Sequence, residues 1–428
     1  MFKVLVIAYY FPPMGLSGVQ RTLKFVKYMK QYNWEPTVIT TGNVGYFAHD
    51  KSLLNEIENE NIRIIRTAGK DPNSLLSRYG TITVPREFIR KLFNRLSQSV
   101  FIPDNKISWS KKAYQAASQI LEKENFDIIF VTIPPFSAFN MAVKLKKKFD
   151  IPLLTDYRDL WVGSYFAFYP TPVHKFLHKR MEYRALKIVD KITVTNRKIK
   201  EKLINSYKFL TFDDIVIVSH GYDAADFENI KLVPKNTDKM VLTYAGVFIE
   251  YSTPEYFLRA FKKLMNERPD VASKIQLNFL GLLRKENKKL IKKLKLDGYV
   301  TDYGYLTHNE TIEKLASSDI LWFMIGKKRN IDAILPGKLF EYFGTHKPII
   351  ACTPKGAART AAVAYEAAFI TEPDNIEEIK STILKVYDLY ARNELPKPNA
   401  DYVEKHRRDY LTEQLTKQFQ FLIKEEVE

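Results

Sequence analysis

Short apolar runs alternate with helical patterns along the whole chain, and this alternation limits the possible folds more than any other feature. Residues 4–8 (Val-Leu-Val-Ile-Ala) contain no polar side chain, as expected of a parallel strand that is buried on both faces. Residues 19–32 then carry apolar side chains at helical spacing between basic ones. Further strands are predicted at residues 36–40, 62–65, 128–132, 152–155, 191–195 and 215–218. This order predicts an α/β fold with a doubly wound parallel sheet.

The alternation is interrupted once, at residues 220–239, which are polar and show neither strand nor helix periodicity. Strands are predicted again at residues 240–246, 275–280, 300–303, 320–324 and 348–351, and helices at 337–344, 356–367 and 376–393. A chain of 428 residues suits two α/β domains better than a single core. We therefore expect two Rossmann-like domains, at residues 1–219 and 240–403, joined by a linker at 220–239. Ligands of such sheets bind outside the carboxyl ends of the strands, so the loops there are the candidate sites.

The single cysteine, Cys352, excludes an internal disulfide and a cysteine-rich metal site. Because Cys352 ends an apolar run, we interpret it as a buried strand residue and not as a nucleophile. No run approaches the roughly 20 apolar residues that span a bilayer. The first residues also lack the charged region and the cleavage site of a signal peptide. We expect a soluble or peripheral protein of the cytoplasm.

Lysine and arginine outnumber aspartate and glutamate by 66 to 49, which gives a net charge of +17. Basic runs at residues 144–148, 175–184 and 284–295 have apolar residues interleaved at helical spacing. They are either solvated helix faces or surfaces for an anionic membrane. Residues 86–95 are the best candidate for a membrane-facing helix, and the alternative is a core-facing helix with one solvated face. No nucleic-acid-binding motif accompanies these runs, so we expect no nucleic-acid partner.

The loop after the first strand, residues 9–19, contains Gly15, Leu16, Ser17 and Gly18. Its glycines allow the backbone to approach a ligand closely, and the free amides at the start of a helix favour an anion. The alternative is that this loop needs glycine only for its geometry. The spacing differs from GxGxxG, so no nicotinamide cofactor is indicated.

Three ionisable residues, Asp156, Arg158 and Asp159, directly follow the strand predicted at 152–155. Charged groups beside a buried strand are costly unless they are paired or used. Two interpretations stay open: an ion pair between Arg158 and a carboxylate, or a set of polar residues in a cleft.

A third segment, residues 335–343, opens a helix with Pro336 and Gly337. The first turn of this helix is expected to present the backbone amides of Lys338, Leu339 and Phe340 to a diphosphate, with the Lys338 charge beside them. Glu341, one turn into the helix, can accept hydrogen bonds from two vicinal ribose hydroxyls. The alternative is an ordinary first helical turn in which the glutamate stabilises the helix dipole.

Together with other segments, these three resemble the GT-B-fold retaining glycosyltransferases of the family-4 (group 1) type. The supporting segments occur in the family's order over nearly the whole chain: residues 101–104 with Trp109, 134–137, 156–161, 220–223 with Asp226 and Phe227, 244–246 and 336–342.

The resemblance implies transfer of a sugar from a nucleotide diphosphate-sugar with retention of the anomeric configuration and without a metal. The donor is then a substrate and no cofactor is needed, with UDP favoured over GDP. The first domain is expected to hold the acceptor, a saccharide or lipid-linked saccharide, and the second the donor. The last helix, within residues 404–428, is expected to pack back on the first domain. The implied setting is bacterial surface polysaccharide or glycan assembly, possible at the anionic inner face of the cell membrane.

The resemblance also assigns roles to individual residues. Glu341 corresponds to the ribose-binding glutamate, and Lys338 with the amides that follow it flanks the diphosphate. Gly18 lies against the donor phosphates, behind the acceptor-side loop of residues 15–17, and Gly246 belongs to the donor side. Arg158 and Asp159 fall near a catalytic His-Asp pair of many relatives.

The chain departs from the family pattern at three places. Ala333 stands where relatives often carry a second glutamate, Phe139 stands where some carry a histidine, and the loop at residues 247–252 lacks the usual basic pair. Three residues are candidates for the missing positive charge: Arg284, Lys327 and Lys328. These departures keep two alternatives open, a GT-B nucleotide-sugar 2-epimerase and a catalytically silent sugar-nucleotide-binding scaffold.

Overall fold

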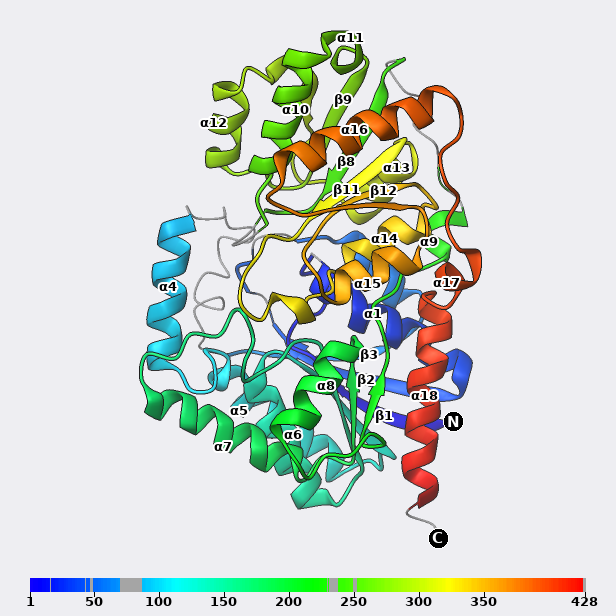
Figure 1. Cartoon of the computed structure of the whole chain (residues 1–428). Helices are drawn as coiled ribbons and strands as arrows, with labels where there is room; N and C mark the ends of the chain where they lie inside the picture. Colours follow the sequence, from blue (N-terminus) through cyan, green and yellow to red (C-terminus); the bar gives the residue numbers. More distant parts are fainter. Residues whose placement is uncertain are drawn as a thin grey trace. The chain divides into compact units, whose positions relative to one another are not determined.

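The computed structural model describes residues 1–15, 17–42, 44–46, 49–69, 87–228, 230, 238–248 and 252–425. The chain forms two compact units (Figure 1). Unit 1 consists of Met1–His220 with Arg408–Glu428, and unit 2 of Gly221–Arg407. Leu16 and residues 231–237 of the predicted linker lie outside the described residues.

Unit 1 is built on a seven-stranded parallel sheet in the order β3-β2-β1-β4-β5-β6-β7. The strands are β1 (Phe2–Ile7), β2 (Trp34–Thr41), β3 (Arg63–Thr67), β4 (Ile128–Ile133), β5 (Leu153–Tyr157), β6 (Lys191–Val194) and β7 (Ile215–Ile217). The strand order reverses between β1 and β4, the place where ligands of doubly wound sheets bind. The predicted parallel α/β fold is therefore confirmed for this unit.

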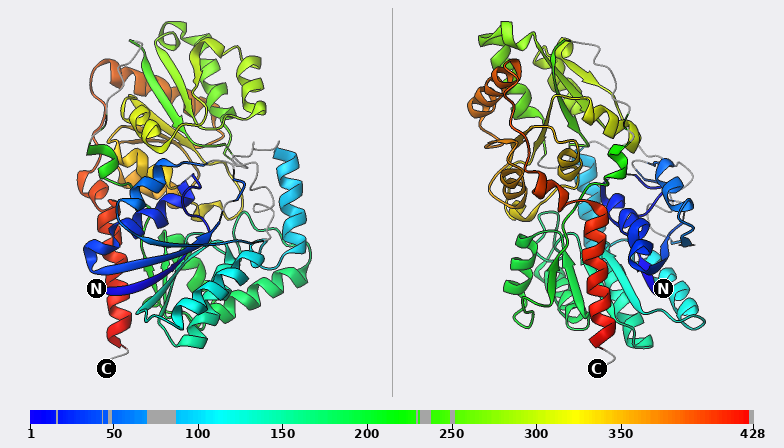
Figure 2. Two further views of the ribbon diagram at one scale, coloured as in Figure 1. Left: turned by 180° about the vertical axis from the view of Figure 1, so that it is seen from behind. Right: turned by 90° about the vertical axis from the view of Figure 1, so that its right-hand side faces the viewer.

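Most helices of unit 1 lie between successive strands in the sequence, as parallel pairing requires. The helices of this unit are α1 (Ser17–Met29), η1 (Lys30–Tyr32), α2 (Ser52–Glu58), α4 (Glu87–Val100), α5 (Ile107–Leu121), α6 (Phe136–Phe149), α7 (Pro172–Leu186), α8 (Arg197–Ser206) and α18 (Arg408–Glu425). The C-terminal helix α18, red in Figure 2, runs beside α1. Its Phe419 packs edge-on against Trp34 with 5.1 Å between ring centroids, and both rings are fully buried. This apolar contact ties the end of the chain to the first strands.

Unit 2 is built on a six-stranded parallel sheet in the order β10-β9-β8-β11-β12-β13. The strands are β8 (Met240–Ala245), β9 (Ile275–Leu280), β10 (Val300–Asp302), β11 (Ile320–Met324), β12 (Ile349–Cys352) and β13 (Ala368–Thr371). The strand order reverses between β8 and β11. Cys352 is buried at the end of β12, where burial raises the pKa of its thiol to about 12, as expected of an unreactive strand residue.

The helices of unit 2 cover both faces of this sheet. They are α9 (Ala225–Glu228), α10 (Glu255–Glu267), α11 (Pro269–Ala272), α12 (Lys285–Lys293), η3 (Asp297–Tyr299), α13 (His308–Ala316), η4 (Ile331–Ala333), α14 (Lys338–Gly344), α15 (Ala357–Ala364), α16 (Ile376–Ala391) and α17 (Ala400–Glu404). The core centres on Trp322 of β11, which stacks on Phe257 of α10 at 3.9 Å between ring centroids. Among the described residues, no helix is both long and apolar enough to cross a membrane.

Several sequence-based assignments need correction. The stretch expected to be an irregular linker contains the short helix α9, so that part of the prediction is wrong. The helix expected to reach residue 367 ends at Ala364, and the unpredicted strand β13 follows it. Strand β13 is short and only partly buried, so its apolar signal is weak.

A buried ion pair links α1 to the middle of the unit 1 sheet. Arg21 of α1 donates to both carboxylate oxygens of Asp156 at 2.7 and 2.9 Å, and neither side chain is exposed to solvent. Thr132 and Thr193 add hydrogen bonds to the same carboxylate, at 3.3 and 3.0 Å. Burial opposes ionisation of Asp156, but the Arg21 charge and these hydrogen bonds outweigh it and lower the pKa of the carboxyl. Arg21 also binds the carbonyl of Ser219 at 2.6 Å, so one guanidinium joins α1, β5 and the segment after β7.

The Asp156→Asn substitution is expected to destabilise unit 1 strongly, because it leaves the Arg21 charge buried and uncompensated. Breaking one half of a buried pair costs about 3–5 kcal/mol. The matched control is Glu201→Gln, which breaks the exposed pairs of Glu201 with Arg197 and Lys198 and should cost less than about 1 kcal/mol. Urea unfolding followed by circular dichroism measures both. Equal losses in the two variants would contradict the assigned role of the buried pair.

Candidate functional site

The loops at the carboxyl edge of the unit 1 sheet are held together by one arginine. Arg158, which follows β5, donates from Nε to the carbonyl of Ile133 at 3.3 Å and from Nη2 to that of Pro134 at 2.7 Å. Its Nη1 donates to the carbonyl of Gly18 in the first turn of α1. The side chain is almost fully buried. Arg158 therefore positions the backbone of two loops at the edge where a ligand is expected.

Of the two interpretations left open for this segment, an ion pair between Arg158 and a carboxylate is wrong. Asp156 pairs with Arg21, and within the described part of the chain no carboxylate lies within ion-pair distance of Arg158. The pKa of Asp159 is raised by burial, against the opposing effect of the Arg158 charge. A catalytic role for Arg158 and Asp159 stays a prediction.

An aromatic cluster that the sequence analysis did not single out lies at the same edge. Tyr9 meets Trp109 edge-on at 5.1 Å, and the Tyr10 ring lies 6.1 Å from that of Tyr46. The Arg158 guanidinium lies 5.8 Å from the centre of the Tyr10 ring. Burial raises the pKa of Tyr46 to about 12, although the Arg158 charge lowers it. Tyr9 and Trp109 are fully buried, so only the half-buried rings of Tyr10 and Tyr46 are available to pack against a saccharide at this edge.

The predicted acceptor-side loop joins this edge. Gly15 is buried, Ser17 begins α1, and Gly18 is exposed in the first turn of that helix. The carbonyl of Gly18 faces Arg158, and a Cβ atom built on Gly18 would lie 3.6 Å from Nη1 of that residue. A Cβ atom there would make an ordinary van der Waals contact with the arginine that holds the loops.

In unit 2, the predicted donor segment begins helix α14 at the carboxyl edge of the sheet. The Lys338 ammonium lies over the ring of Tyr244, at the end of β8, 3.8 Å from its centre. A Cβ atom on Gly246 would lie 3.5 Å from Lys338 Nζ. Burial lowers the pKa of Lys338 to about 7, although the negative charge of Glu341 raises it. This lysine is poised between its charged and neutral forms near pH 7.

The loops after β8 and β9 require glycine for this arrangement. Gly246 and Gly281 have φ angles of +118° and +115°, which disfavour any other residue. A Cβ atom on Gly281 would lie 2.6 Å from the Gly246 carbonyl oxygen, and the Gly246 amide donates to Leu280 at 2.7 Å. The two loops are therefore packed backbone to backbone beside the Lys338 ammonium.

Arg284 approaches the same loop from the other side. Its Nε donates to the carbonyl of Phe248 at 2.8 Å, and the Phe248 ring stacks on Tyr244 at 3.9 Å. Thus Gly246, Arg284 and Lys338, far apart in sequence, meet at the loop after β8. The structure does not place Lys327 with them. Lys327 pairs with Asp374 at 2.7 Å and Glu372 at 3.1 Å, and these carboxylates raise its pKa.

In the first turn of α14, the backbone amides of Leu339 and Phe340 are not free as predicted but are hydrogen-bonded within the chain. The Leu339 amide donates to Pro336 at 3.1 Å and the Phe340 amide donates to Gly337 at 3.0 Å. The expectation that these two amides are presented to a ligand is therefore wrong, because a tight turn before the helix uses them. Both side chains are fully buried, and Glu341 is half-buried.

Tyr342, which the sequence analysis passed over, fixes the position of α14. Its hydroxyl accepts a hydrogen bond from the Ala245 amide at 2.8 Å and donates to the carbonyl of Trp322 at 3.2 Å. The helix is thereby attached to β8 and β11, the two strands on either side of the reversal in strand order. No periodic pattern distinguishes such a tyrosine from an ordinary core residue.

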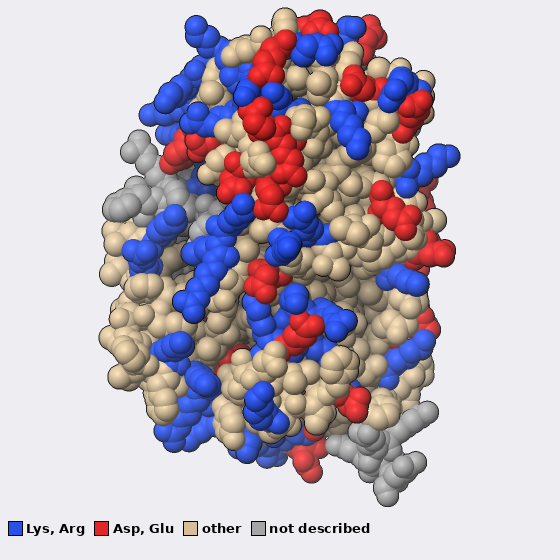
Figure 3. All heavy atoms as spheres, viewed as in Figure 1, with Lys and Arg blue, Asp and Glu red and all other residues tan. Residues whose placement is uncertain are grey.

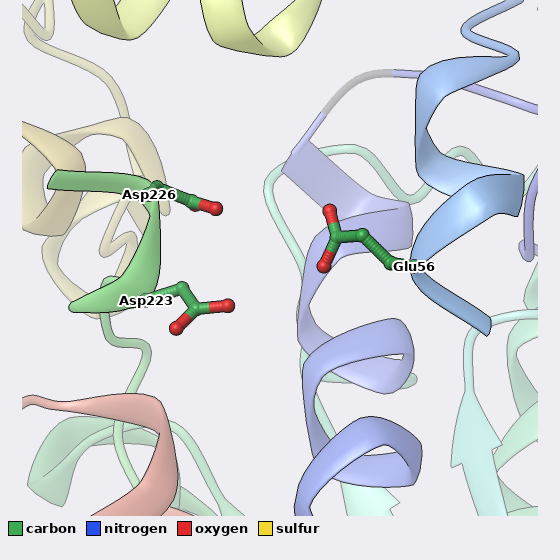
Figure 4. A group of neighbouring side chains, drawn as sticks. All are labelled: Glu56, Asp223 and Asp226. Atoms are coloured by element: carbon green, nitrogen blue, oxygen red, sulfur yellow. The ribbon is translucent and has the colours of Figure 1, made fainter. Parts of the chain in front are cut away.

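The short helix α9 contributes two carboxylates to unit 2 (Figure 4). Asp223 caps the Ala225 amide at 3.2 Å, and Asp226 contacts Nε2 of His308 at 2.7 Å. These contacts fix α9 and α13 within the unit. Glu56, also drawn in Figure 4, belongs to unit 1, where Lys24 binds it at 2.7 Å.

The Lys338→Met substitution is expected to stabilise the ligand-free protein. The unfolded chain keeps this lysine charged up to about pH 10, whereas in the folded chain its pKa is about 7. The unfolded state therefore binds more protons between these values, and the wild type gains stability as the pH rises. Lys338→Met should be about 1–3 kcal/mol more stable at pH 7, and the difference should shrink toward pH 10. Urea titrations at several pH values measure this.

The control for that experiment is Lys289→Met on the exposed face of α12, for which we expect no comparable gain. A difference between Lys338→Met and the wild type that does not change with pH would show that burial of the ammonium is not its cause.

Two family models match the chain. Residues 18–226 match the model of Glycosyltransferase Family 4, and residues 226–405 match that of Glycosyl transferases group 1. Among curated protein sequences, none matches. The two family matches meet at residue 226 and together cover residues 18–405, which include every described strand except β1.

Solved structures match the chain over nearly its whole length. Sucrose-phosphate synthase from Thermosynechococcus elongatus matches with a TM-score of 0.68 and 13% identity over 99% of both chains. HepE of Anabaena in complex with UDP-glucose matches with a TM-score of 0.64 and 12% identity over 98% of this chain and 100% of that one. WaaG, a glycosyltransferase involved in lipopolysaccharide biosynthesis, matches with a TM-score of 0.58 and 14% identity over 96% of this chain and 98% of that one.

At these identities the structures show the fold, and the two family models show the class of protein. Both agree with the two parallel α/β sheets described above. The chain is a glycosyltransferase of the GT-B fold, with a family-4 first half and a group-1 second half.

Proposed function

We propose that the protein transfers a sugar from a nucleotide diphosphate-sugar to a saccharide or lipid-linked saccharide, with retention of the anomeric configuration. The observation that carries this proposal is the Lys338 ammonium packed on Tyr244 beside Gly246. Within the described residues, no carboxylate lies within ion-pair distance of Lys338. The half-buried Lys338 ammonium has only the more distant charge of Glu341 to balance it, and a diphosphate would supply a closer counter-charge.

Arg284 supports the same assignment. Its guanidinium binds the Phe248 carbonyl in the loop where relatives carry their basic pair. The missing charge of that loop is thus supplied from the segment after β9. Together with Lys338, Arg284 places two cations near the proposed diphosphate. They would stabilise the negative charge that develops on this leaving group as the bond to the sugar breaks.

Glu341 completes the proposed donor site. It lies three residues after Lys338 in α14, so the two side chains share one face of the helix. A carboxylate there can accept hydrogen bonds from two ribose hydroxyls while Lys338 contacts the phosphates. The nucleotide would then lie across the first turn of α14.

If the sugar is transferred in a single step, retention requires that the acceptor attack from the same face of the sugar that the leaving group leaves. We propose that a leaving phosphate oxygen accepts the proton of the acceptor hydroxyl, so that no protein base is needed. Arg158 acts as a hydrogen-bond donor to carbonyls and would hold the acceptor-side loops. Lys338 and Arg284 would stabilise the developing phosphate charge.

UDP is the proposed nucleotide of the donor, in preference to GDP. The support is that the matching HepE structures were determined with UDP and with UDP-glucose. Surface polysaccharide or glycan assembly is the proposed setting, since WaaG is involved in lipopolysaccharide biosynthesis and the matching WaaB is a lipopolysaccharide outer core galactosyltransferase. The protein would act in the cytoplasm, at the inner face of the cell membrane.

A nucleotide-sugar 2-epimerase is the second candidate, because a putative UDP-N-acetylglucosamine 2-epimerase from Listeria monocytogenes also matches, with a TM-score of 0.57. Incubation with UDP-N-acetylglucosamine alone separates the two functions. An epimerase produces the 2-epimer without an acceptor, whereas a transferase releases UDP only when an acceptor is present.

The Glu341→Ala and Lys338→Ala variants should each lower kcat/KM for the donor by about tenfold to a thousandfold, because each loses charge-assisted hydrogen bonds worth about 1.5–3 kcal/mol apiece. Nucleotide release in the presence of acceptor is the measurement. Glu286→Ala, in the first turn of α12, is the matched control and should retain activity. Wild-type kcat/KM in both α14 variants would place the donor elsewhere.

Binding of UDP should weaken as the pH rises above 7. The diphosphate favours the charged form of Lys338, whose pKa is about 7 in the free protein. Binding therefore takes up a proton, and affinity should fall by up to about tenfold per pH unit until the pKa of the bound form is reached. Calorimetry in buffers of different ionisation enthalpy counts the proton.

Lys338→Arg serves as the control, since arginine stays charged throughout this range. Its affinity for UDP should be independent of pH. If the wild type and Lys338→Arg lost affinity in parallel, another group would be responsible.

A further inference from the structure

Apolar side chains are exposed on one part of unit 1 to an unusual degree. On α4, Phe93, Leu96 and Val100 are 64%, 55% and 72% exposed, and on α7, Val173 and Phe176 are 62% and 60% exposed. The expectation that residues 86–95 form a core-facing helix is therefore wrong for the side chains that are described. Residues 86–90 lie outside the described side chains.

These two helices are joined into one surface by the loop between β5 and α7. Gln98 of α4 accepts a hydrogen bond from the Phe168 amide at 2.7 Å, and Ser99 contacts Nε2 of His174 in α7 through its carbonyl at 3.1 Å. The Arg95 guanidinium lies 5.4 Å from the centre of the Phe168 ring. We call α4, residues 162–171 and α7 the α4–α7 surface.

Among the described side chains of the α4–α7 surface, the exposed charged residues are all basic. Its exposed basic residues are Lys91, Arg95, Lys175, Lys179, Arg180 and Arg184. Glu182 is the one acidic residue within the described residues 91–101 and 162–184. It is buried and accepts hydrogen bonds from Tyr157 and Tyr207. In the lower left of Figure 3, where α7 lies in Figure 1, blue and tan spheres predominate.

We propose that the α4–α7 surface docks on an anionic lipid bilayer, with its apolar side chains in the interface and its basic ones against the headgroups. Exposed aromatic and aliphatic side chains beside lysine and arginine are the combination that binds such interfaces. The occupant is not a second copy of the chain, because a two-fold dimer sets a surface against itself and would oppose the same basic residues.

The position of this surface connects it to the proposed acceptor site. Its loop begins at the carboxyl end of β5, where Trp161 stacks on Phe136 at 4.9 Å and donates to His178 of α7 at 2.9 Å. Docking would bring this edge of the sheet to the membrane, where a lipid-linked saccharide presents its sugar. The choice of a lipid-linked acceptor rests on the proposed function. Vesicle binding is measured without any sugar transfer, so membrane docking and the proposed activity can each fail independently of the other.

The test is flotation of the full chain with vesicles of phosphatidylcholine, with and without phosphatidylglycerol. The protein should float only with the anionic vesicles at low salt, and less at high salt. The double variant Lys179→Glu, Arg180→Glu should bind at least about tenfold more weakly, and Phe176→Ser about tenfold more weakly.

Two control variants distinguish binding through this surface from binding through the overall positive charge of the protein. Lys292→Glu with Lys293→Glu removes the same charge from α12, a basic helix on which no large apolar side chain is exposed. Val363→Ser removes an equally exposed apolar side chain from α15. Both control variants should float like the wild type, and every variant should still bind UDP.

A fluorescent reporter tests insertion directly. All four native tryptophans are buried, so Phe176→Trp introduces the one exposed indole. Its emission should shift to the blue with anionic vesicles. The proposal fails if the wild type does not bind anionic vesicles at low salt, if the α12 variant weakens binding as much as the α7 variant, or if light scattering shows a dimer that Phe176→Ser dissociates.

Discussion

The contact between the Lys338 ammonium and the Tyr244 ring determines how the carboxyl edge of unit 2 is built. It brings helix α14 against the end of β8, beside the loop in which Gly246 adopts a φ of +118° that favours glycine. The Tyr342 hydroxyl fixes the same helix to β8 and β11. A positive charge is thus held at the reversal in strand order, with an aromatic face and not a carboxylate as its nearest partner. A buried ammonium in such a setting is unfavourable by itself, and the proposed anionic ligand rests on this observation.

Unit 1 depends on two arginines with different tasks. Arg21 neutralises Asp156 inside the sheet and joins segments that are more than a hundred residues apart. Arg158 uses its donors on backbone carbonyls and so sets the shape of the loops around the aromatic cluster. Both arginines use their side-chain donors for structural contacts within unit 1. Both also lie near the carboxyl ends of the strands, where the acceptor is proposed to bind. Rigid loops of this kind position a substrate without supplying a reacting group.

Much of the fold was predictable from the sequence, because parallel strands buried on both faces are uninterrupted apolar runs; β9 and β11 were predicted with the bounds that the structure shows. Strand β13 was not predicted because it is short and half-buried. Helix α5 was missed because alanine, serine and lysine dilute its periodicity. In the candidate site, Lys338 and Glu341 were found through the Pro-Gly start of α14. The roles of Arg21 and Tyr342 were not, since contacts across 135 and 97 residues leave no local pattern.

The most direct test of the donor site is a crystal structure of the protein with UDP. The account predicts that a diphosphate oxygen lies within about 3 Å of Lys338 Nζ, and that the Glu341 carboxylate contacts the ribose hydroxyls. Nucleotide bound with neither contact, or Lys338 still packed on Tyr244 with no phosphate oxygen near it, would contradict the central claim.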